Sequence, residues 1–290
     1  MPDFWTHILG GELVTKEMKE TEEKKYVEMI KNHQELFNLG CEGPDIFFYN
    51  DFWPWISEKR GPEIGDKLHQ EQIRKLFNTS LNFLKNNQDN EHFAQLFAYL
   101  SGLVVHYALD KRIHPFIYQE TNNFPEHKNL EINIDTYLTN KYWNKLAHRL
   151  PPTPAVDVGK KLPPIINEYY QYLLEKLGHD YDEKVINDSY QDFKRVFKLF
   201  YSRWRFKRYL LKAINPLLSF DLNTLIYPTR PDYQLLSSDD YNYVERLLLQ
   251  SVGEAHEMLR KVIKFIQGEV KEEDMQSAFP NINFDGQKIN

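Results

Sequence analysis

The chain has 290 residues, of which 41% are hydrophobic and 14% aromatic, so it can bury a large core, and this composition excludes a disordered or fibrous protein. A formal net charge of -6 argues against a general affinity for nucleic acid, which usually accompanies clustered surplus Lys and Arg. The single cysteine, Cys41, excludes an internal disulfide and is expected to be a small buried hydrophobe.

The first residues lack the basic start, apolar run and small-residue cleavage site that characterise a signal peptide. The sequence also has no stretch of about 18 apolar residues, the length that would predict a membrane-spanning helix. We therefore expect a cytoplasmic protein.

Apolar residues recur at helical spacing through the first half of the chain. Residues 15–39 have the pattern of a half-buried helix, and helical patterns follow over 64–86 and 91–113, the last ending before Pro115. Between the first two, the aromatic stretch 46–55 contains a proline and is expected to be a buried, irregular crossing.

The second half continues in the same way, and strand-like alternation does not recur. Helices are expected over 127–148, 165–177, 182–215 and 241–268, with a Pro-rich linker over 150–164. These patterns predict an all-α fold.

Two pairs of metal-type side chains lie on the predicted helices. His106 and Asp110 are four residues apart, as are His127 and Glu131, so each pair lies on one face of its helix. His114 lies between the pairs. Imidazole nitrogen and carboxylate oxygen suit zinc or a similar ion better than calcium, and manganese or iron would accept the same ligands.

A single pair of this kind is more often a surface hydrogen bond or ion pair. Two pairs with an intervening histidine are harder to explain in that way, and the residues around His106 and Asp110 are nearly all apolar. A buried charge needs a partner, and a metal ion is the strongest partner available. This segment therefore favours a metal site.

Three further candidates lie upstream. His7 follows an aromatic pair, Asp45 lies in a Gly-Pro-Asp turn, and His69 falls in a helical pattern. Each has an ordinary alternative, which is packing for His7, a turn or helix cap for Asp45, and a solvated helix position for His69.

The order and local context of these motifs (WTH, GPDIFFY, GDKLH, HYALD and HKNLE) resemble the zinc-dependent phospholipase C family, which is related in fold to the single-strand-specific zinc nucleases. The resemblance covers about the first half of the chain. It implies a single multi-helix bundle of that type, holding two or three zinc ions. By position, the ligands would be His7, Asp45, His69, His106, Asp110, His114, His127 and Glu131.

The resemblance also implies how the ligands are shared. Asp45 and His69 would bind one ion together with His106, and Asp110 would bridge that ion to a neighbour bound by His7. The last three ligands would hold the remaining ion. In that family a metal-activated water attacks the phosphorus of a phosphodiester, and Asp45 would be the catalytic residue that orients or deprotonates this water.

The start of the chain departs from the family pattern. Secreted members chelate one zinc through the free amine and carbonyl of an amino-terminal tryptophan, whereas Trp5 is internal here. The resemblance therefore supports two ions and leaves the ion at His7 and Asp110 open. Asp135, one turn beyond Glu131, is either a carboxylate that orients a ligand histidine or a solvated charge.

One domain over residues 1–290 is expected rather than two. It would comprise a metal-site half over 1–149, the Pro-rich linker over 150–164, a helical completion over 165–270 and a flexible tail over 271–290. The linker could instead mark a domain boundary, since helices are predicted on both sides of it.

The expected substrate is a phospholipid or a small phosphodiester, and no stable nucleic-acid partner is expected. The basic, aromatic stretch 201–212 would either meet a membrane surface or form a solvated stripe. Two alternatives remain, a single-strand nuclease with the same metals and a cytoplasmic metal-binding protein with little catalysis. The sequence does not reveal the oligomeric state.

Overall fold

A computed structural model of the protein describes residues 3–20, 24–53, 56–201, 203–204, 207, 209–210, 213 and 226–289. Over these residues the chain forms helices and no β-strand, which confirms the all-α fold. The α-helices are α1 (Phe4–Lys19), α2 (Lys24–Asn32), α3 (Gln34–Cys41), α4 (Arg60–Gln70), α5 (Ile73–Asn86), α6 (Phe93–Glu120), α7 (Phe124–Trp143), α8 (Pro164–Leu177), α9 (Glu183–Phe200), α11 (Ser238–Ile266) and α12 (Glu272–Met275). The 3-10 helices are η1 (Gly43–Tyr49), η2 (Ala147–Arg149) and η3 (Thr153–Ala155).

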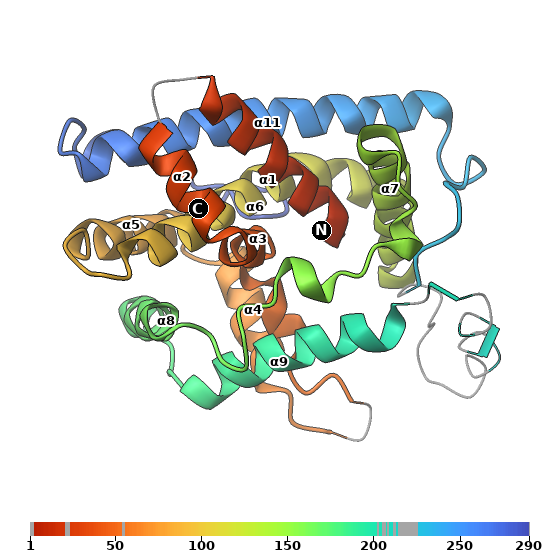
Figure 1. The fold of residues 1–290 in the computed structure, drawn as a ribbon, viewed down its shortest axis with the longest axis horizontal. Helices are drawn as coiled ribbons and strands as arrows, with labels where there is room; N and C mark the ends of the chain where they lie inside the picture. The colour runs from red at the N-terminus through yellow and green to blue at the C-terminus, as the bar shows by residue number, and fades with distance from the viewer. Residues whose placement is uncertain are drawn as a thin grey trace.

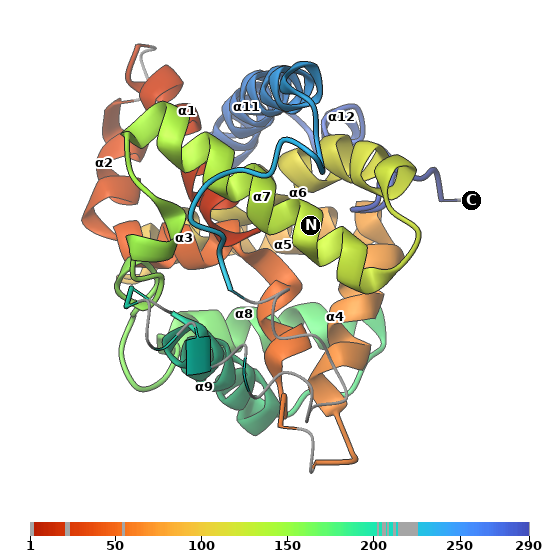
Figure 2. The same ribbon diagram turned by 90° about the vertical axis from the view of Figure 1, so that its right-hand side faces the viewer.

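Helix α6 lies at the centre of the fold and packs against α1, α2, α3 and α11 (Figure 1). Every residue from 96 to 110 is buried, which suits a segment that is apolar around its whole circumference. Helices α8 and α9 lie on the side of the molecule opposite α11 (Figure 2). The two polar groups at the end of this stretch, His106 and Asp110, are thereby held in the interior.

Helices α3 and α6 cross with their backbones in direct contact. A Cβ added at Gly40 would overlap the carbonyl oxygen of Tyr99, and one added at Gly102 would overlap that of Phe37. Only glycine permits this approach. The crossing brings the end of α3 and the turn into η1 alongside the polar end of the buried α6 stretch.

The single helix expected over residues 15–39 is wrong. The segment belongs to three helices, and α1 begins as early as Phe4. Gly10 and Gly11 weaken the helical signal there, yet they allow α1 to pack closely on Leu109 and Phe37. Helix α2 ends before His33, whose backbone angles are not helical.

Two other helix boundaries differ from expectation. The pattern over 64–86 is broken at Gln72, which has a positive φ of 49°. Helix α6 continues through Pro115 to Glu120 instead of ending before the proline. Proline removes one backbone donor, so the carbonyl of Lys111 loses its intrahelical partner, while the helix itself persists in its packed surroundings.

The remaining expected elements are shifted by smaller amounts. Helix α7 begins upstream of His127 because the Asn123 side chain accepts a hydrogen bond from the Glu126 amide and caps the helix. Helix α9 ends at Phe200, and half of the basic stretch 201–212 lies outside the described residues. In the aromatic stretch, Ile46 and Phe47 are buried in η1.

Residues 271–289 contribute buried side chains to the fold, which differs from the flexible tail expected from the sequence. Helix α12 begins this segment, and Phe279 and Phe284 are completely buried. The Pro-rich linker also lies against the core, because Val156 and Leu162 are buried and the Leu162 amide donates to Asn187 of α9. One hydrophobic cluster includes residues from α1 to Phe284.

None of the described helices has both the length and the apolar content that a membrane span requires.

Candidate metal centre

Helix α6 presents three metal-type side chains along one face. His106, Asp110 and His114 follow one another at four-residue intervals, and all three side chains are buried. Because the helix continues through Pro115, His114 lies on the same rigid support as the other two.

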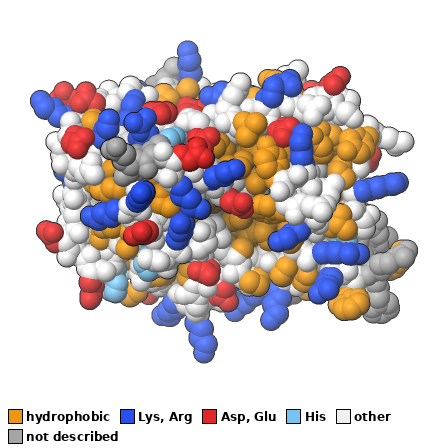
Figure 3. Space-filling model, turned by 45° about the horizontal axis from the view of Figure 1, so that its top comes forward, with side chains coloured by type: hydrophobic (Ala, Val, Ile, Leu, Met, Phe, Trp, Pro, Cys, Tyr) orange, Lys and Arg blue, Asp and Glu red, His pale blue; other side chains and the backbone are white. Residues whose placement is uncertain are grey.

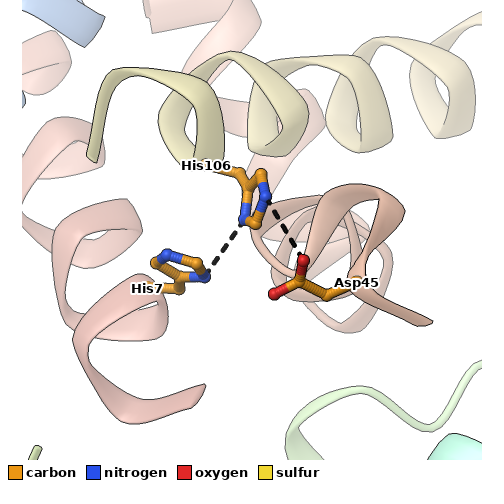
Figure 4. Close-up of side chains that lie close together, drawn as sticks. All are labelled: His7, Asp45 and His106. Atoms are coloured by element: carbon orange, nitrogen blue, oxygen red, sulfur yellow. Dashed lines mark hydrogen bonds and ion pairs between the residues drawn. The ribbon is translucent and has the colours of Figure 1, made fainter. Parts of the chain in front are cut away.

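The segments on either side of α6 contribute further groups. His7 from α1 and Asp45 from η1 approach His106 from different directions (Figure 4). The two histidine Nδ1 atoms are 3.1 Å apart, and His106 Nε2 lies 3.8 Å from Asp45 Oδ1. Gly43 has a φ of +52°, and a Cβ there would lie 2.7 Å from the His106 ring. Glycine at this position therefore lets the turn carry Asp45 up to the histidine.

Four buried polar atoms converge at this point, namely Asp45 Oδ1, His69 Nε2, His106 Nε2 and Asp110 Oδ2. They have no hydrogen-bond partner within the described parts of the chain. His69 Nε2 is 2.9 Å from Asp45 Oδ1, and His106 Nε2 is 3.3 Å from Asp110 Oδ2. Atoms bound to one zinc at about 2.0–2.1 Å in tetrahedral geometry lie about 3.3 Å apart. This first group of ligands, Asp45, His69, His106 and Asp110, therefore fits a zinc ion.

Backbone carbonyls fix the tautomer of three histidines. Nδ1 lies 2.7 Å from the Gly65 carbonyl oxygen in His69, 2.9 Å from that of Cys41 in His106, and 2.8 Å from that of Phe284 in His114. A carbonyl can only accept, so Nδ1 carries the proton in each ring. The Nε2 lone pair is then free for a metal, as is usual for metal-binding histidines.

Asp110 faces two histidines with its two oxygens. Oδ1 lies 2.9 Å from His7 Nε2, and Oδ2 lies on the His106 side. This is the arrangement of a bridging carboxylate. A second ion beside His7 would have both His7 and Asp110 within reach.

A separate group of ligand atoms comes from α6 and α7. His114, His127 and Glu131 each offer one ligand atom, and these three atoms lie close enough together to bind one metal ion. His127 Nε2 is 2.8 Å from Glu131 Oε1, one helical turn away. His114 Nε2 has no hydrogen-bond partner among the residues that the structure describes.

The electrostatics of the centre favour bound cations. Burial lowers the pKa of His106 and of His114 well below the ordinary histidine value, so both rings are neutral and can act as ligands. Burial raises the pKa of the Asp110 carboxyl, because negative charge is unfavourable in an apolar interior. A cation at this position would remove that penalty.

Two charged residues near the centre were not identified from the sequence. Glu42 is buried, and its Oε1 lies 3.9 Å from His7 Nδ1. Burial, with Asp45 nearby, raises the pKa of Glu42 well above its usual range. Lys128 is also buried, with Nζ 2.7 Å from Asp3 and 3.2 Å from Glu131. The available signals were the position of Glu42 just before the Gly-Pro-Asp turn and that of Lys128 beside a ligand histidine.

Asp135 has neither of the two roles that the sequence suggested. Its carboxylate accepts hydrogen bonds from the backbone amides of Trp5 and Thr6, at 2.7 and 2.8 Å, and from the Tyr227 hydroxyl at 2.9 Å. It therefore holds the first turn of α1, the helix that carries His7. The backbone amide of Trp5 is therefore already hydrogen-bonded to the Asp135 carboxylate.

All eight predicted site residues are thus buried and fall into groups that fit metal ions. The donor atoms are imidazole nitrogens and carboxylate oxygens, a set that suits zinc. Ions held this way would polarise a phosphoryl oxygen and activate water.

Comparison with known proteins gives one match. The sequence model of the family described as zinc-dependent phospholipase C matches residues 6–209, a region that contains every residue of both groups. Searches of the curated proteins and of the solved structures gave no match. The chain belongs to the zinc-dependent phospholipase C family, whose members are phosphodiester hydrolases.

Proposed function

We propose that this protein hydrolyses the phosphodiester bond of a phospholipid at a centre of two firmly held zinc ions. The observation that carries the proposal is the convergence beside η1 of four buried ligand atoms that have no hydrogen-bond partner among the described residues. Such atoms are expensive to bury without a partner, and a divalent cation satisfies all of them together.

The ligands divide between the two ions as the distances suggest. Asp45, His69, His106 and Asp110 would hold one ion. The group on α6 and α7, composed of His114, His127 and Glu131, would hold the other. A third ion beside His7 would share Asp110 and have fewer protein ligands, so we expect it to bind more weakly than the first two.

Zinc at these positions would supply Lewis-acid stabilisation of the phosphoryl oxygens and a water of lowered pKa. Asp45 is the group best placed to orient this water and accept its proton, because its carboxylate lies at the edge of the first group next to His69 and His106. The carbonyl anchors on the histidines keep their rings fixed, so that the site does not reorganise as charge develops.

A phospholipid substrate requires an apolar surface near the centre. Tyr118, at the end of α6, packs on His127 with ring centroids 4.9 Å apart and is partly exposed. Phe124 begins α7 three residues before His127 and is 76% exposed. We propose that these two rings contact the lipid at a membrane surface.

The nucleic-acid alternative is less favoured. The chain carries a net charge of -6. On the face that carries α11, Lys and Arg side chains are interspersed with Asp and Glu rather than gathered in a stripe (Figure 3). A surface that tracks phosphates would concentrate positive charge.

The test combines metal analysis with an activity assay. The purified protein should contain about two zinc ions per chain, and it should release phosphorylated head group from phosphatidylcholine. His106→Ala should lose zinc and activity, and Asp45→Asn should lower kcat by about 10²–10⁴-fold. His92→Ala, an exposed histidine at the start of the same helix, is the matched control.

Less than one zinc per chain, or activity that survives both changes, would refute the proposal. Hydrolysis of single-stranded DNA in preference to phosphatidylcholine would favour the nuclease alternative.

A further inference from the structure

Residues 281–289 form a tight hairpin beyond the region that the family model matches. The Ile289 amide donates to the Asn281 carbonyl at 3.0 Å, and the Asn283 amide donates to the Gln287 carbonyl at 2.8 Å. Within the turn, the Gly286 amide donates to the Asn283 carbonyl. We call this segment the 281–289 hairpin.

One residue of the hairpin touches both groups of candidate ligands. The backbone carbonyl of Phe284 accepts the Nδ1 proton of His114 at 2.8 Å, and its amide donates to the backbone carbonyl of His69 at 3.1 Å. Its ring, which is 0% exposed, lies 4.8 Å from the His69 ring and 5.5 Å from the His106 ring, measured between centroids. Phe284 thus contacts three of the eight candidate ligands.

The neighbouring residue ties the hairpin to two helices. Asp285 accepts hydrogen bonds from the Tyr118 hydroxyl of α6 at 3.0 Å and from the side-chain Nε2 of Gln70, in α4, at 2.5 Å. Its Oδ1 also lies 3.4 Å from His114 Nδ1. A carboxylate beside the outer nitrogen of a metal-binding imidazole makes that ring a stronger ligand.

Gly286 allows the hairpin to reach this position. It has a φ of +78°, and a Cβ there would lie 2.5 Å from the Lys111 carbonyl oxygen and 2.6 Å from Pro115 Cγ. Lys111 O is the carbonyl that Pro115 leaves without an intrahelical donor. The hairpin therefore packs against the turn of α6 between Asp110 and His114, and a side chain at position 286 would displace it.

We propose that the 281–289 hairpin is a positioning element of the zinc centre, with Phe284 and Asp285 as its positioning residues. The inference rests on the ligand assignment proposed above. The Phe284 carbonyl fixes the proton of His114 on Nδ1 and so turns the Nε2 lone pair toward the ion. The Phe284 amide holds the end of α4, and with it the His69 ring. Asp285 adds its charge at the outer nitrogen of His114.

The first variant is Gly286→Ala in the full-length chain, with Gly268→Ala as its control. Gly268 has nearly the same φ, +80°, but a Cβ there would meet nothing within 4 Å among the described residues. Both changes carry the same backbone strain, and only the first displaces the hairpin. Gly286→Ala should weaken zinc binding by about 10–100-fold, as expected for loss of groups that orient metal ligands.

Zinc affinity is measured by competition with a chromogenic chelator, and coordination geometry by the visible spectrum of the cobalt-substituted protein.

Asp285→Asn, which keeps the size and shape of the side chain, provides a second variant should Gly286→Ala fail to fold. It should weaken zinc binding by about tenfold and alter the cobalt spectrum. A change of fold stability alone would leave that spectrum unaltered.

The outcomes are distinct. Weaker zinc binding in Gly286→Ala and Asp285→Asn, with Gly268→Ala like the wild type, supports the inference. Wild-type affinity and spectrum in Asp285→Asn, together with wild-type affinity in any folded Gly286→Ala protein, overturn it while leaving the proposed function intact. A wild-type protein that binds no zinc overturns the ligand assignment and the inference together.

Discussion

Asp135 shows how one buried carboxylate can govern a site it does not enter. It accepts hydrogen bonds from the backbone amides in the first turn of α1 and from the Tyr227 hydroxyl. It thereby fixes the helix that places His7 beside Asp110. Burial, followed by the nearby charge of Asp3, raises the pKa of Asp135 to about 7.

The raised pKa of Asp135 makes the stability of the folded protein depend on pH. The pKa of Asp135 in the unfolded chain should be near its ordinary value of 3.8, so the folded state binds this proton more tightly. The resulting stabilisation is complete below about pH 3.8 and is lost as the pH rises through about 7. Urea unfolding of the metal-free protein at pH 5 and pH 8 should therefore show a larger loss of stability for the wild type than for Asp135→Asn. An equal loss in both proteins would contradict the assignment.

Phe124 gives a second prediction at the residue scale. An exposed phenylalanine that enters a lipid surface gains about 1.5–3 kcal/mol, so Phe124→Ala should weaken vesicle binding by about tenfold or more. Hydrolysis of a water-soluble, short-chain phosphodiester should be unchanged, because the metal ligands are untouched. Leu249→Ala, which removes a partly exposed apolar side chain from α11, is the control. Equal effects on vesicle and soluble substrates would argue against a lipid contact.

The crossing of α3 and α6 is the element on which His106 depends. It brings the Cys41 carbonyl at the end of α3 to the Nδ1 atom of His106. Because the two backbones touch at Gly40 and Gly102, the position of this carbonyl is set by the distance between the helices.

Widening this crossing should affect both stability and metal binding. Gly102→Ala should cost about 1–3 kcal/mol of unfolding free energy through overpacking, and zinc affinity should fall as the Cys41 carbonyl moves from His106. At Gly253, in α11, an added Cβ would meet nothing within 4 Å in the described parts of the chain, so Gly253→Ala should instead stabilise the protein by about 0.5–1 kcal/mol. Urea denaturation and chelator competition measure the two effects. Wild-type zinc affinity in Gly102→Ala would separate the crossing from the metal centre.

Helical spacing explains why the candidate ligands could be predicted. Pairs four residues apart mark one face of a helix whatever the helix packs against, so His106 with Asp110 and His127 with Glu131 were identifiable from the sequence. The apolar surroundings of the first pair also predicted its burial. The motif order added the upstream residues.

Other features of the centre left no such signal. The carbonyls of Gly65, Cys41 and Phe284 anchor the histidines, and every residue type has a carbonyl. The passage of α6 through Pro115 depends on packing that lies far away in the sequence. The glycines of α1 and α3 weaken helical propensity locally, while their benefit appears only in contacts between helices.

At the scale of the whole molecule, buried carboxyl groups are concentrated around the centre. Among the described residues, six buried carboxyl groups lie there with one buried lysine, Lys128. The carboxyl groups belong to Asp3, Glu42, Asp45, Asp110, Glu131 and Asp135. Divalent cations would stabilise the ionised form of these carboxyl groups in the interior, so the fold itself should depend on bound metal.

Removal of metal should therefore destabilise the protein as well as inactivate it. An ion present at about 100 times its dissociation constant contributes about 2.7 kcal/mol, which corresponds to about 4–5 °C in the unfolding temperature of a chain of this size. Calorimetry before and after treatment with EDTA should show such a fall for each firmly bound ion. Zinc should restore the original temperature, and magnesium, which prefers oxygen ligands, should not. An unfolding temperature that does not respond to EDTA would contradict the charge argument.

The contact of the 281–289 hairpin with the ligand histidines also sets an order of events during synthesis. His7 leaves the ribosome early, whereas Phe284 follows roughly 280 residues later, which at about 5–20 residues per second takes roughly 15–55 s. Throughout that interval the nascent chain exposes histidines and carboxylates whose final orientation is not yet fixed. Zinc acquisition should therefore be completed after translation of the hairpin, and ribosome-bound chains stalled before residue 281 should hold zinc more weakly than released chains.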